Sequence, residues 1–281
     1  MQEPVIEDVR SSSAYSKYQT FFNNVDIDNA IVIPGLKTTM VPQGMCKNGD
    51  YIYVSAYDHT GSNYSCVYLI NALTGRLVKT LRFKDSFNHV GGVATDGTYL
   101  YVCCNHRIGI IKLTTLHNAN DGDNVVLTYI PVKTDTGSEL ACSFCSYDSY
   151  KNLLWVGTFN ADEADYAYGF KTNGTESLTL TTKISVPAKT QGIFFIDNYV
   201  YFSTSYGRNN ASNIYKCTIS GSGLNYTYTV EETIEAPPTS EGIFIENNKL
   251  YILFENAASY FYNDTSNPTQ YAVDRIFAYN L

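Results

Sequence analysis

Short segments in which apolar and polar residues alternate recur along the chain, and each has an aromatic residue at its centre. Side chains of a β-strand point alternately to its two faces, so this pattern predicts strands with one face in a core. The aromatic residues are about 50 residues apart, a period typical of repeat proteins. The segments are 51–55, 99–103, 153–157, 199–203 and 249–253, centred on Tyr53, Tyr101, Trp155, Tyr201 and Tyr251.

A second apolar segment precedes each aromatic segment, and four of these five contain glycine at the same place. Glycine weakens a strand interior unless another backbone approaches closely, as it does among the innermost strands around the channel of a β-propeller. We therefore interpret these segments as inner strands. They begin with Gln43-Gly44, Gly91-Gly92, Ala141-Cys142, Gln191-Gly192 and Glu241-Gly242.

Two further alternating segments follow each aromatic segment, except that the chain stops before a fourth strand of the last repeat. The unpaired apolar segment 30–33 precedes the first repeat, so we expect it to supply that missing strand and to close the ring. The third strands are expected at 66–70, 108–113, 166–170, 213–217 and 275–279, and the fourth strands at 77–81, 125–130, 178–184 and 228–234.

Four strands in each of five repeats predict an all-β fold, a five-bladed β-propeller over residues 29–281. Residues 1–28 lie outside the repeats and form an N-terminal extension. Within it Tyr15, Tyr18 and Phe22 have the spacing of one short amphipathic helix packed on the ring.

Composition agrees with β-structure, because 25 Tyr and 14 Phe accompany a low fraction of charged residues, 16%. The net charge of −8 and the lack of any basic run exclude nucleic acid as a partner. No apolar run approaches the roughly 18 residues of a membrane span, so none is expected.

The seven cysteines are an odd number and fall mostly inside apolar segments, which favours core thiols over disulfides or a zinc site. A composition poor in Lys and rich in Tyr, Asn, Ser and Thr is typical of a secreted or cell-envelope bacterial protein. We expect such a location here, with the leader absent from the sequence given.

In a propeller, the connections into the inner strands and the loops after the aromatic strands reach the same face of the ring, at one mouth of the channel. Polar residues converge there, where ligand sites on propellers usually form. They would bind a small molecule, a peptide or a protein, or they would only satisfy backbone groups and ordered water. The candidate ligand-binding residues are Gln43, Asp58, His89, His106, Asn160, Gln191, Tyr206, Arg208 and Glu241.

The loop from 256 to 274 is the longest of its kind and carries Tyr260, Phe261, Tyr262 and Tyr271. A long aromatic loop beside a channel predicts a lid or a stacking wall, with Tyr260 as a further ligand-binding candidate. The alternative is that this loop only packs on the neighbouring blade.

Two resemblances follow from these segments. The stretches 42–44, 53–58, 89–94 and 240–243 resemble a group of secreted bacterial propeller proteins without assigned activity. More locally, Thr190-Gln-Gly-Ile-Phe-Phe195, the stretch 201–207 and Glu241-Gly-Ile243 resemble the glutamine cyclotransferases, five-bladed propellers that cyclise N-terminal glutamine. The acid of that family's Glu-Gly motif is Glu241 here, whereas Phe202 stands where the family has another acid.

The leading hypothesis is a ligand-binding or protein-interaction scaffold with its site at the channel mouth. The alternative is an enzyme of cyclotransferase type, with Glu241 as general acid or base if the channel raises its pKa. A metal-dependent lactonase or hydrolase is the other enzymatic reading, in which a divalent ion such as calcium would be bound by Glu139, Asn160 and Glu241.

Overall fold

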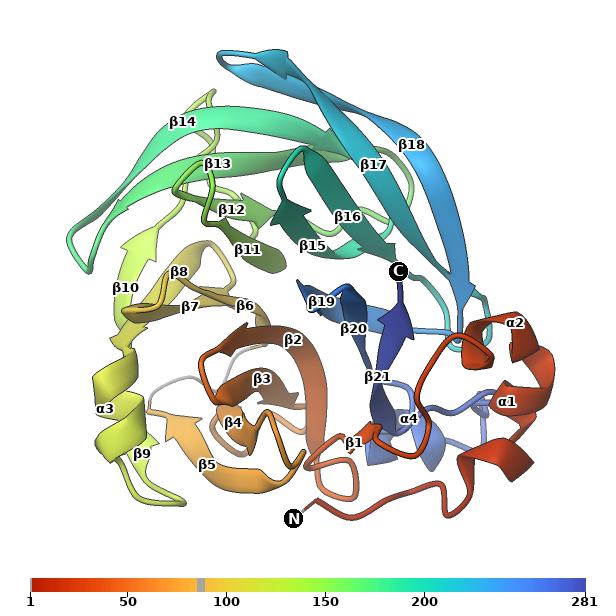
Figure 1. The fold of residues 1–281 in the computed structure, drawn as a ribbon. Coiled ribbons are helices and arrows are strands. Elements are labelled where there is room, and N and C mark those ends of the chain that lie inside the picture. The colour runs from red at the N-terminus through yellow and green to blue at the C-terminus, as the bar shows by residue number, and fades with distance from the viewer. Residues whose placement is uncertain (1, 85–88) are drawn as a thin grey trace.

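The chain folds into antiparallel sheets that stand around a central axis, as the computed structural model in Figure 1 shows. The structure describes residues 2–84 and 89–281. Almost all regular structure in these ranges is β-strand, and the few helices are short. The expected all-β, propeller-like fold is confirmed.

The first two sheets follow one another along the chain. In each, successive strands pair as antiparallel neighbours from the axis outwards, the arrangement of a propeller blade. The first has β2 (Met40–Asn48), β3 (Tyr51–Asp58), β4 (Cys66–Asn71), β5 (Leu77–Phe83) and β9 (Asn124–Val125). The second has β6 (Val90–Thr95), β7 (Tyr99–Cys104), β8 (Arg107–Lys112) and β10 (Thr128–Pro131), and α3 (Leu113–Asn118) follows β8.

The third sheet has eight strands, because two four-stranded groups are joined at their outer edges. The junction is a short parallel pairing in which Lys183 lies opposite Asn225 and Ile184 opposite Tyr226. In spatial order the strands are β11 (Phe144–Asp148), β12 (Leu153–Gly157), β13 (Asp165–Asn173), β14 (Ser177–Val186), β18 (Asn225–Ala236), β17 (Ser212–Ser222), β16 (Tyr199–Thr204) and β15 (Thr190–Ile196).

The last sheet joins the two ends of the chain. Ile31 lies opposite Ile276 and Val32 opposite Arg275, so the early apolar segment is the outer strand beside the C-terminal strand. The sheet consists of β1 (Ile31–Val32), β21 (Arg275–Asn280), β20 (Lys249–Phe254) and β19 (Ser240–Glu246), and α4 (Ser259–Tyr262) lies in the loop before β21.

Two strand predictions need correction. The segment 125–130 is not one strand, because β9 leaves its own repeat and pairs in parallel with β5, while β10 pairs with β8. The third inner strand begins at Phe144 rather than at 141. This repeat has Ser143 and Phe144 in place of the residue-glycine pair, because Phe144 lies opposite Gly157 as Gly44 lies opposite Ser55.

The inner strands pack against one another in a closed circuit, and a glycine lies at every junction except that between β11 and β15. A Cβ on Gly44 would lie 2.4 Å from Cα of Gly92, and a Cβ on Gly92 would lie 2.7 Å from N of Cys145. A Cβ on Gly242 would lie 2.4 Å from N of Met45, which brings the last repeat back to the first. The expected close backbone approach is confirmed, and it leaves no room for a side chain.

Aromatic residues of the second strands pack between neighbouring repeats. Tyr53, Tyr101, Trp155 and Tyr201 are buried. Trp155 stacks on Phe195 of the following inner strand, with ring centroids 4.7 Å apart. All seven cysteines are free and six of them are buried, as expected of core thiols. The number of blades stays a prediction, because hydrogen bonding divides the strands into four sheets.

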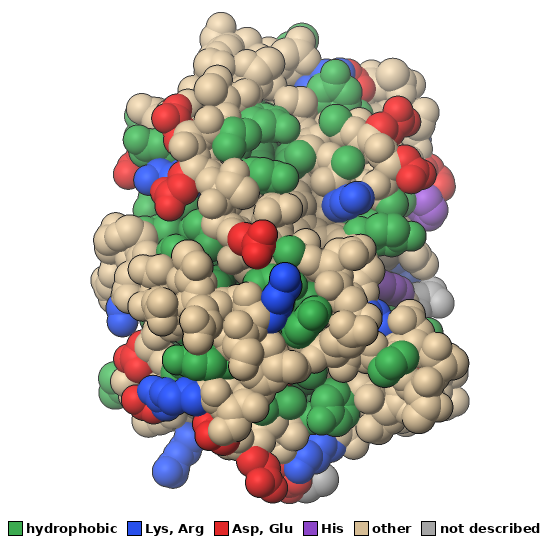
Figure 2. Space-filling view, turned by 90° about the vertical axis from the view of Figure 1, so that its right-hand side faces the viewer, with side chains coloured by type: hydrophobic (Ala, Val, Ile, Leu, Met, Phe, Trp, Pro, Cys, Tyr) green, Lys and Arg blue, Asp and Glu red, His purple; other side chains and the backbone are tan. Residues whose placement is uncertain are grey.

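The N-terminal extension contains η1 (Val9–Ser11), α1 (Ser13–Lys17) and α2 (Gln19–Phe22). The chain is not helical at Tyr18, so the stretch forms two short helices, and Phe22 packs edge-on against Phe277 of β21. None of the helices in the described ranges is long and apolar enough to span a membrane. On the side shown in Figure 2, Lys and Arg side chains are scattered among acidic and polar ones.

Candidate functional site

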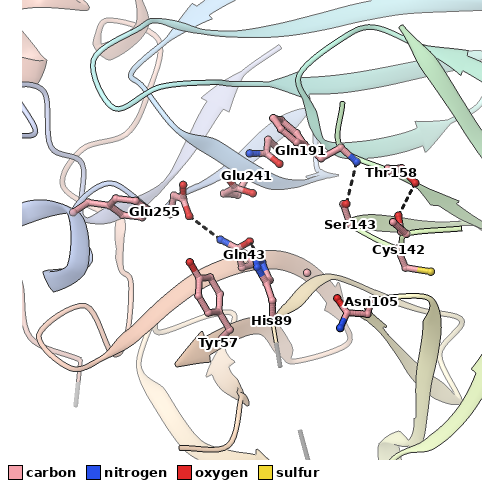
Figure 3. A pocket seen from close by; sticks show the side chains of 14 residues that line it. Gln43, Tyr57, His89, Asn105, Cys142, Ser143, Thr158, Gln191, Glu241 and Glu255 are labelled. Carbon is pink, nitrogen blue, oxygen red and sulfur yellow. Dashed lines mark hydrogen bonds between the residues drawn. The ribbon is translucent and has the colours of Figure 1, made fainter. Parts of the chain in front are cut away.

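A cavity of about 390 Å³ lies at the mouth of the channel, where the inner strands begin. Figure 3 shows the side chains that converge on it from several sheets. Four of the ten predicted ligand-binding residues line the cavity. Three of them lie on inner strands, and His89 immediately precedes the inner strand β6. These four residues are Gln43, His89, Gln191 and Glu241.

β-Bulges orient three of these side chains towards the cavity. Strand pairing slips between Pro42 and Gly44, between Thr190 and Gly192, and between Ser240 and Ile243. A bulge leaves one residue unpaired and redirects its side chain. Gln43, Gln191 and Glu241 occupy these irregular positions and line the cavity. The residue-glycine pair in the sequence therefore marks a bulge, whose first residue faces the cavity and whose glycine meets the next inner strand.

Two glutamates share one side of the cavity. Glu241 is only 3% exposed, and its Oε1 is buried without a hydrogen-bond partner among the described residues. Burial and the neighbouring charge of Glu255 raise the pKa of Glu241 well above its usual value. Glu255 follows β20, and burial raises its pKa to about 8, opposed by a hydrogen bond from Gln43 and the charge of Arg208.

Gln43 connects Glu255 to the rim of the cavity. Its Nε2 donates to Oε2 of Glu255 at 2.7 Å, and its Oε1 lies 2.6 Å from Nε2 of His89. Since an amide oxygen only accepts, Nε2 of His89 donates in this pair. The His89 ring stacks on Tyr57 at 4.1 Å, and burial lowers the pKa of His89, which favours the neutral ring. We call Gln43, Glu241 and Glu255 the carboxyl wall.

The opposite side of the cavity carries uncharged groups, as Figure 3 shows. Oγ1 of Thr158 donates to the carbonyl of Ala141 at 2.6 Å, and Oγ of Ser143 accepts from N of Phe159 at 3.0 Å. Burial raises the pKa of the Cys142 thiol, which therefore stays protonated. We call this side the neutral wall; it comprises Asn105, Cys142, Ser143 and Thr158.

Several predicted residues lie outside the cavity. Asp58 is buried in a turn, where Oδ2 accepts from N of Ser62 and N of Asn63. Burial raises the pKa of Asp58, but hydrogen bonds to its carboxylate lower it further, so the net shift is downwards. These hydrogen bonds hold the loop together. His106 and Tyr206 are exposed, and Oδ1 of Asn160 accepts from nearby backbone NH groups.

The expected metal ligands are not brought together at the cavity. Only Glu241 lines it, while Glu139 is an exposed residue and Asn160 caps its own loop. Within 2–84 and 89–281, no group of three or more His, Cys, Asp or Glu side chains is placed to hold a metal ion.

The long loop after β20 reaches the cavity through Phe261, which lines it. Tyr260 is instead 45% exposed and stacks on His59, with ring centroids 4.6 Å apart. Arg208 stands behind this loop and binds Asp264. The loop is thus one wall of the site, with Phe261 rather than Tyr260 facing the cavity.

Several lining residues, among them Tyr57, Ser143 and Thr158, were absent from the predicted site. A signal existed for Tyr57, since alternation along β3 places it on the same strand face as Tyr53 and Ser55. Ser143 precedes Phe144 as Gln43 precedes Gly44, so it holds the cavity-facing position of its repeat. Glu255 matters because it neighbours Glu241 in the folded chain, and the sequence alone does not show this proximity.

Comparisons with known proteins give only distant likenesses. No family model matches the chain, and no curated protein matches it. Similar solved structures include glutaminyl cyclase of Myxococcus xanthus, at 12% identity and TM-score 0.49, covering 80% of this chain and 91% of that one. A putative 6-phosphogluconolactonase of Bacteroides uniformis is 12% identical with TM-score 0.43, covering 76% of this chain and 63% of that one. BamB of Moraxella catarrhalis is 11% identical with TM-score 0.36, covering 89% and 60%. No function passes from these proteins to this chain.

Proposed function

We propose that the chain is a five-bladed propeller whose channel mouth binds a small organic cation. The count of five takes the eight-stranded sheet as two blades joined by their outer strands β14 and β18. It is supported by the circuit of five inner strands, β2, β6, β11, β15 and β19, each packed against the next.

The observation that carries the proposal is the Glu241 carboxyl group, buried with an unpartnered oxygen next to a second glutamate. A buried carboxylate is costly unless a positive charge or several donors compensate it. No Lys or Arg is found among the described residues that line the cavity. A cationic ligand would supply the positive charge that allows one of these two buried carboxyl groups to ionise.

The remaining lining fits such a ligand. Tyr57 and Phe261 present aromatic rings beside the carboxyl wall, and aromatic faces attract ammonium groups. The amide groups of Gln43 and Gln191 and the hydroxyl groups of the neutral wall offer hydrogen bonds to the rest of the molecule. The cavity volume of about 390 Å³ suits a compact small molecule.

Calorimetric titration tests this function with two probes of nearly equal shape, n-butylammonium and n-butanol. We expect one molar equivalent of the cation to bind at least tenfold more tightly than the alcohol at pH 8. Glu255→Gln should weaken cation binding by about 2–3 kcal/mol, or roughly 100-fold, because it removes the ionisable partner.

The matched control is Glu163→Gln, which makes the same change of net charge at an exposed residue outside the cavity. We expect it to leave the affinity unchanged. Equal affinity for cation and alcohol, or an equal loss in both variants, would contradict the proposal.

An acid–base enzyme is the second candidate. The pKa of Glu241 is raised well above its usual value by burial and by the charge of Glu255, and burial raises the pKa of Glu255 to about 8; a pair of carboxyl groups with shifted pKa values is a usual part of such a site. By the resemblance to glutamine cyclotransferases, a peptide with N-terminal glutamine is the substrate to test. Ammonia release that Glu241→Gln abolishes would support this function, and no release above the uncatalysed rate would remove it.

A further inference from the structure

Two consecutive hydrogen bonds connect the rim of the cavity to Glu255. Nε2 of His89 donates to Oε1 of Gln43 at 2.6 Å, and Nε2 of Gln43 donates to Oε2 of Glu255 at 2.7 Å, the bond drawn in Figure 3. His89 precedes β6, Gln43 lies on β2 and Glu255 follows β20, so three sheets contribute to this arrangement. We call these three residues the hydrogen-bond chain.

The amide group at the centre of the chain is held in one orientation. Nε2 of Gln43 also donates to the carbonyl of Pro42 at 3.0 Å, so both of its N–H groups have acceptors. An amide turned over would place its oxygen against the carboxylate oxygen of Glu255, and two acceptors repel each other. The amide oxygen therefore points away from Glu255 and needs a donor of its own, which His89 supplies.

The donor ring is fixed in its turn. His89 stacks on Tyr57, with ring centroids 4.1 Å apart and an interplanar angle of 20°. Tyr57 lies on β3 and lines the cavity, as all members of the hydrogen-bond chain do. A ring held on this surface directs its Nε2 at Gln43, so the position of Glu255 is set from the rim of the cavity.

The carboxyl oxygens that remain for a ligand require N–H donors. Oε2 of Glu255 accepts from Gln43, which leaves Oε1 of the same group, and Oε1 of Glu241 is buried without a partner among the described residues. Figure 3 shows both carboxyl groups on one side of the cavity. A primary ammonium group carries three N–H donors for these oxygens. A quaternary ammonium group has the same charge but no donor, so Oε1 of Glu241 would stay unpaired at the cost of its desolvation.

We propose that His89 is a positioning residue whose hydrogen bond to Gln43 orients Glu255, so that the carboxyl wall selects primary alkylammonium ligands over quaternary ones. This inference rests on the proposed cation-binding function and names the class of cation. The rings of Tyr57 and Phe261 attract ammonium groups of either kind. The discrimination therefore comes from the carboxyl oxygens.

Two probes of the same charge and nearly the same shape test the selection, tert-butylammonium and tetramethylammonium. Calorimetric titration at pH 8 should show roughly tenfold tighter binding of tert-butylammonium, because only this probe offers N–H donors. Equal affinities, or tighter binding of tetramethylammonium, would show that the aromatic rings govern recognition and would overturn the selection.

Replacement of His89 tests its positioning role. At pH 8 a histidine ring is neutral, so His89→Phe keeps a ring on Tyr57, changes no charge and removes the N–H donor. We expect the affinity for tert-butylammonium to fall roughly tenfold and that for tetramethylammonium to change less than about twofold. His89→Gln carries an amide nitrogen as far along the side chain as Nε2 and should restore most of the preference. An equal loss for both probes in His89→Phe would leave His89 a structural role only and would overturn the inference.

A double variant tests whether His89 acts through Gln43. Gln43→Met keeps the length of the side chain and removes the bonds to His89 and Glu255, so it should reduce the preference at least as much as His89→Phe. Combining the two substitutions should add no further loss, because the second removes a bond that is already broken. Additive losses would contradict the chain. Urea denaturation monitors folding, and His89→Phe at the exposed rim keeps the inference testable if Gln43→Met does not fold.

Failure of the underlying function has a different signature. If the unmodified protein shows no preference for n-butylammonium over n-butanol, cation binding itself is wrong, whatever the variants do. If that preference exists but tert-butylammonium and tetramethylammonium bind equally, only the inference drawn from the hydrogen-bond chain is overturned.

Discussion

The two walls of the channel-mouth cavity are built by equivalent parts of the repeat, yet they differ in charge. On the carboxyl wall, Glu241 occupies a bulge of an inner strand and Glu255 follows the adjacent aromatic strand. On the neutral wall, Ser143 precedes an inner strand and Thr158 follows the adjacent aromatic strand. Both walls thus use the start of an inner strand and the end of the adjacent aromatic strand.

The difference teaches that the repeat determines where side chains enter the cavity, and that residue identity at those places determines the chemistry. Ser143 and Thr158 satisfy backbone groups of their own sheet. Oε1 of Glu241 has no partner among the described residues. Among the described lining residues, the buried polar atom without a partner thus lies on the carboxyl wall, which is where we expect ligand binding to depend on charge.

The largest effect on stability is expected from the closely packed inner strands, which support both walls. Gly242→Ala and Gly92→Ala each place a methyl group within 2.7 Å of a neighbouring backbone atom, so each should lower the free energy of unfolding by about 3 kcal/mol. Urea denaturation measures this loss. Ser143→Ala, which removes an atom at the same level of the ring, should cost no more than about 1 kcal/mol. If only one of the two glycine variants lost stability, the two walls would not depend on the same packing of inner strands.

A smaller and pH-dependent effect is expected for Glu241→Gln. The pKa of Glu241 is raised in the folded state, so its contribution to stability is present below its usual pKa and is lost as pH rises towards the folded value. Glu241→Gln removes this loss and should make the protein more stable than the unmodified chain at pH 8.

The measurement for Glu241→Gln is thermal unfolding at pH 4.5 and at pH 8. The two proteins should be nearly equal at the lower pH and differ at the higher one. The exposed Glu163→Gln variant should show no such divergence. An equal difference at both pH values would mean that Glu241 is not buried as a protonated acid.

The smallest effect is expected on the neutral wall. Thr158→Val preserves shape and removes one hydroxyl donor to the carbonyl of Ala141. We expect less than a twofold change in butylammonium affinity at any pH between 6 and 9, measured by calorimetry. A change as large as that of Glu255→Gln would remove the distinction between the two walls.

Much of the fold could be predicted because alternation and repetition are local properties of the sequence. The aromatic second strands and the pairing of Ile31 and Val32 with the C-terminal strand followed from them. The parallel junctions of β14 with β18 and of β5 with β9 could not be predicted, since they join outer strands of different repeats. Such contacts depend on the lengths and twists of whole strands.

The candidate site was predicted in part for the same reason. Gln43, Gln191 and Glu241 share a sequence motif, and that motif is the bulge that faces the cavity. Asp58 carries an equally polar side chain, but its own turn satisfies one of its oxygens. The sequence shows which residues are polar. Whether a polar side chain remains available to a ligand depends on whether nearby backbone NH groups already bind it, and only the structure shows this.

Proton release on ligand binding tests cation recognition by the carboxyl wall most directly. With a pKa of about 8, Glu255 is mostly protonated at pH 7 and must ionise to pair with an ammonium group. Calorimetry of butylammonium binding in two buffers of different ionisation enthalpy should show release of about one proton at pH 7 and almost none at pH 9. Binding without proton release at pH 7, or with proton uptake, would contradict the assignment of Glu255 as the partner of the cation.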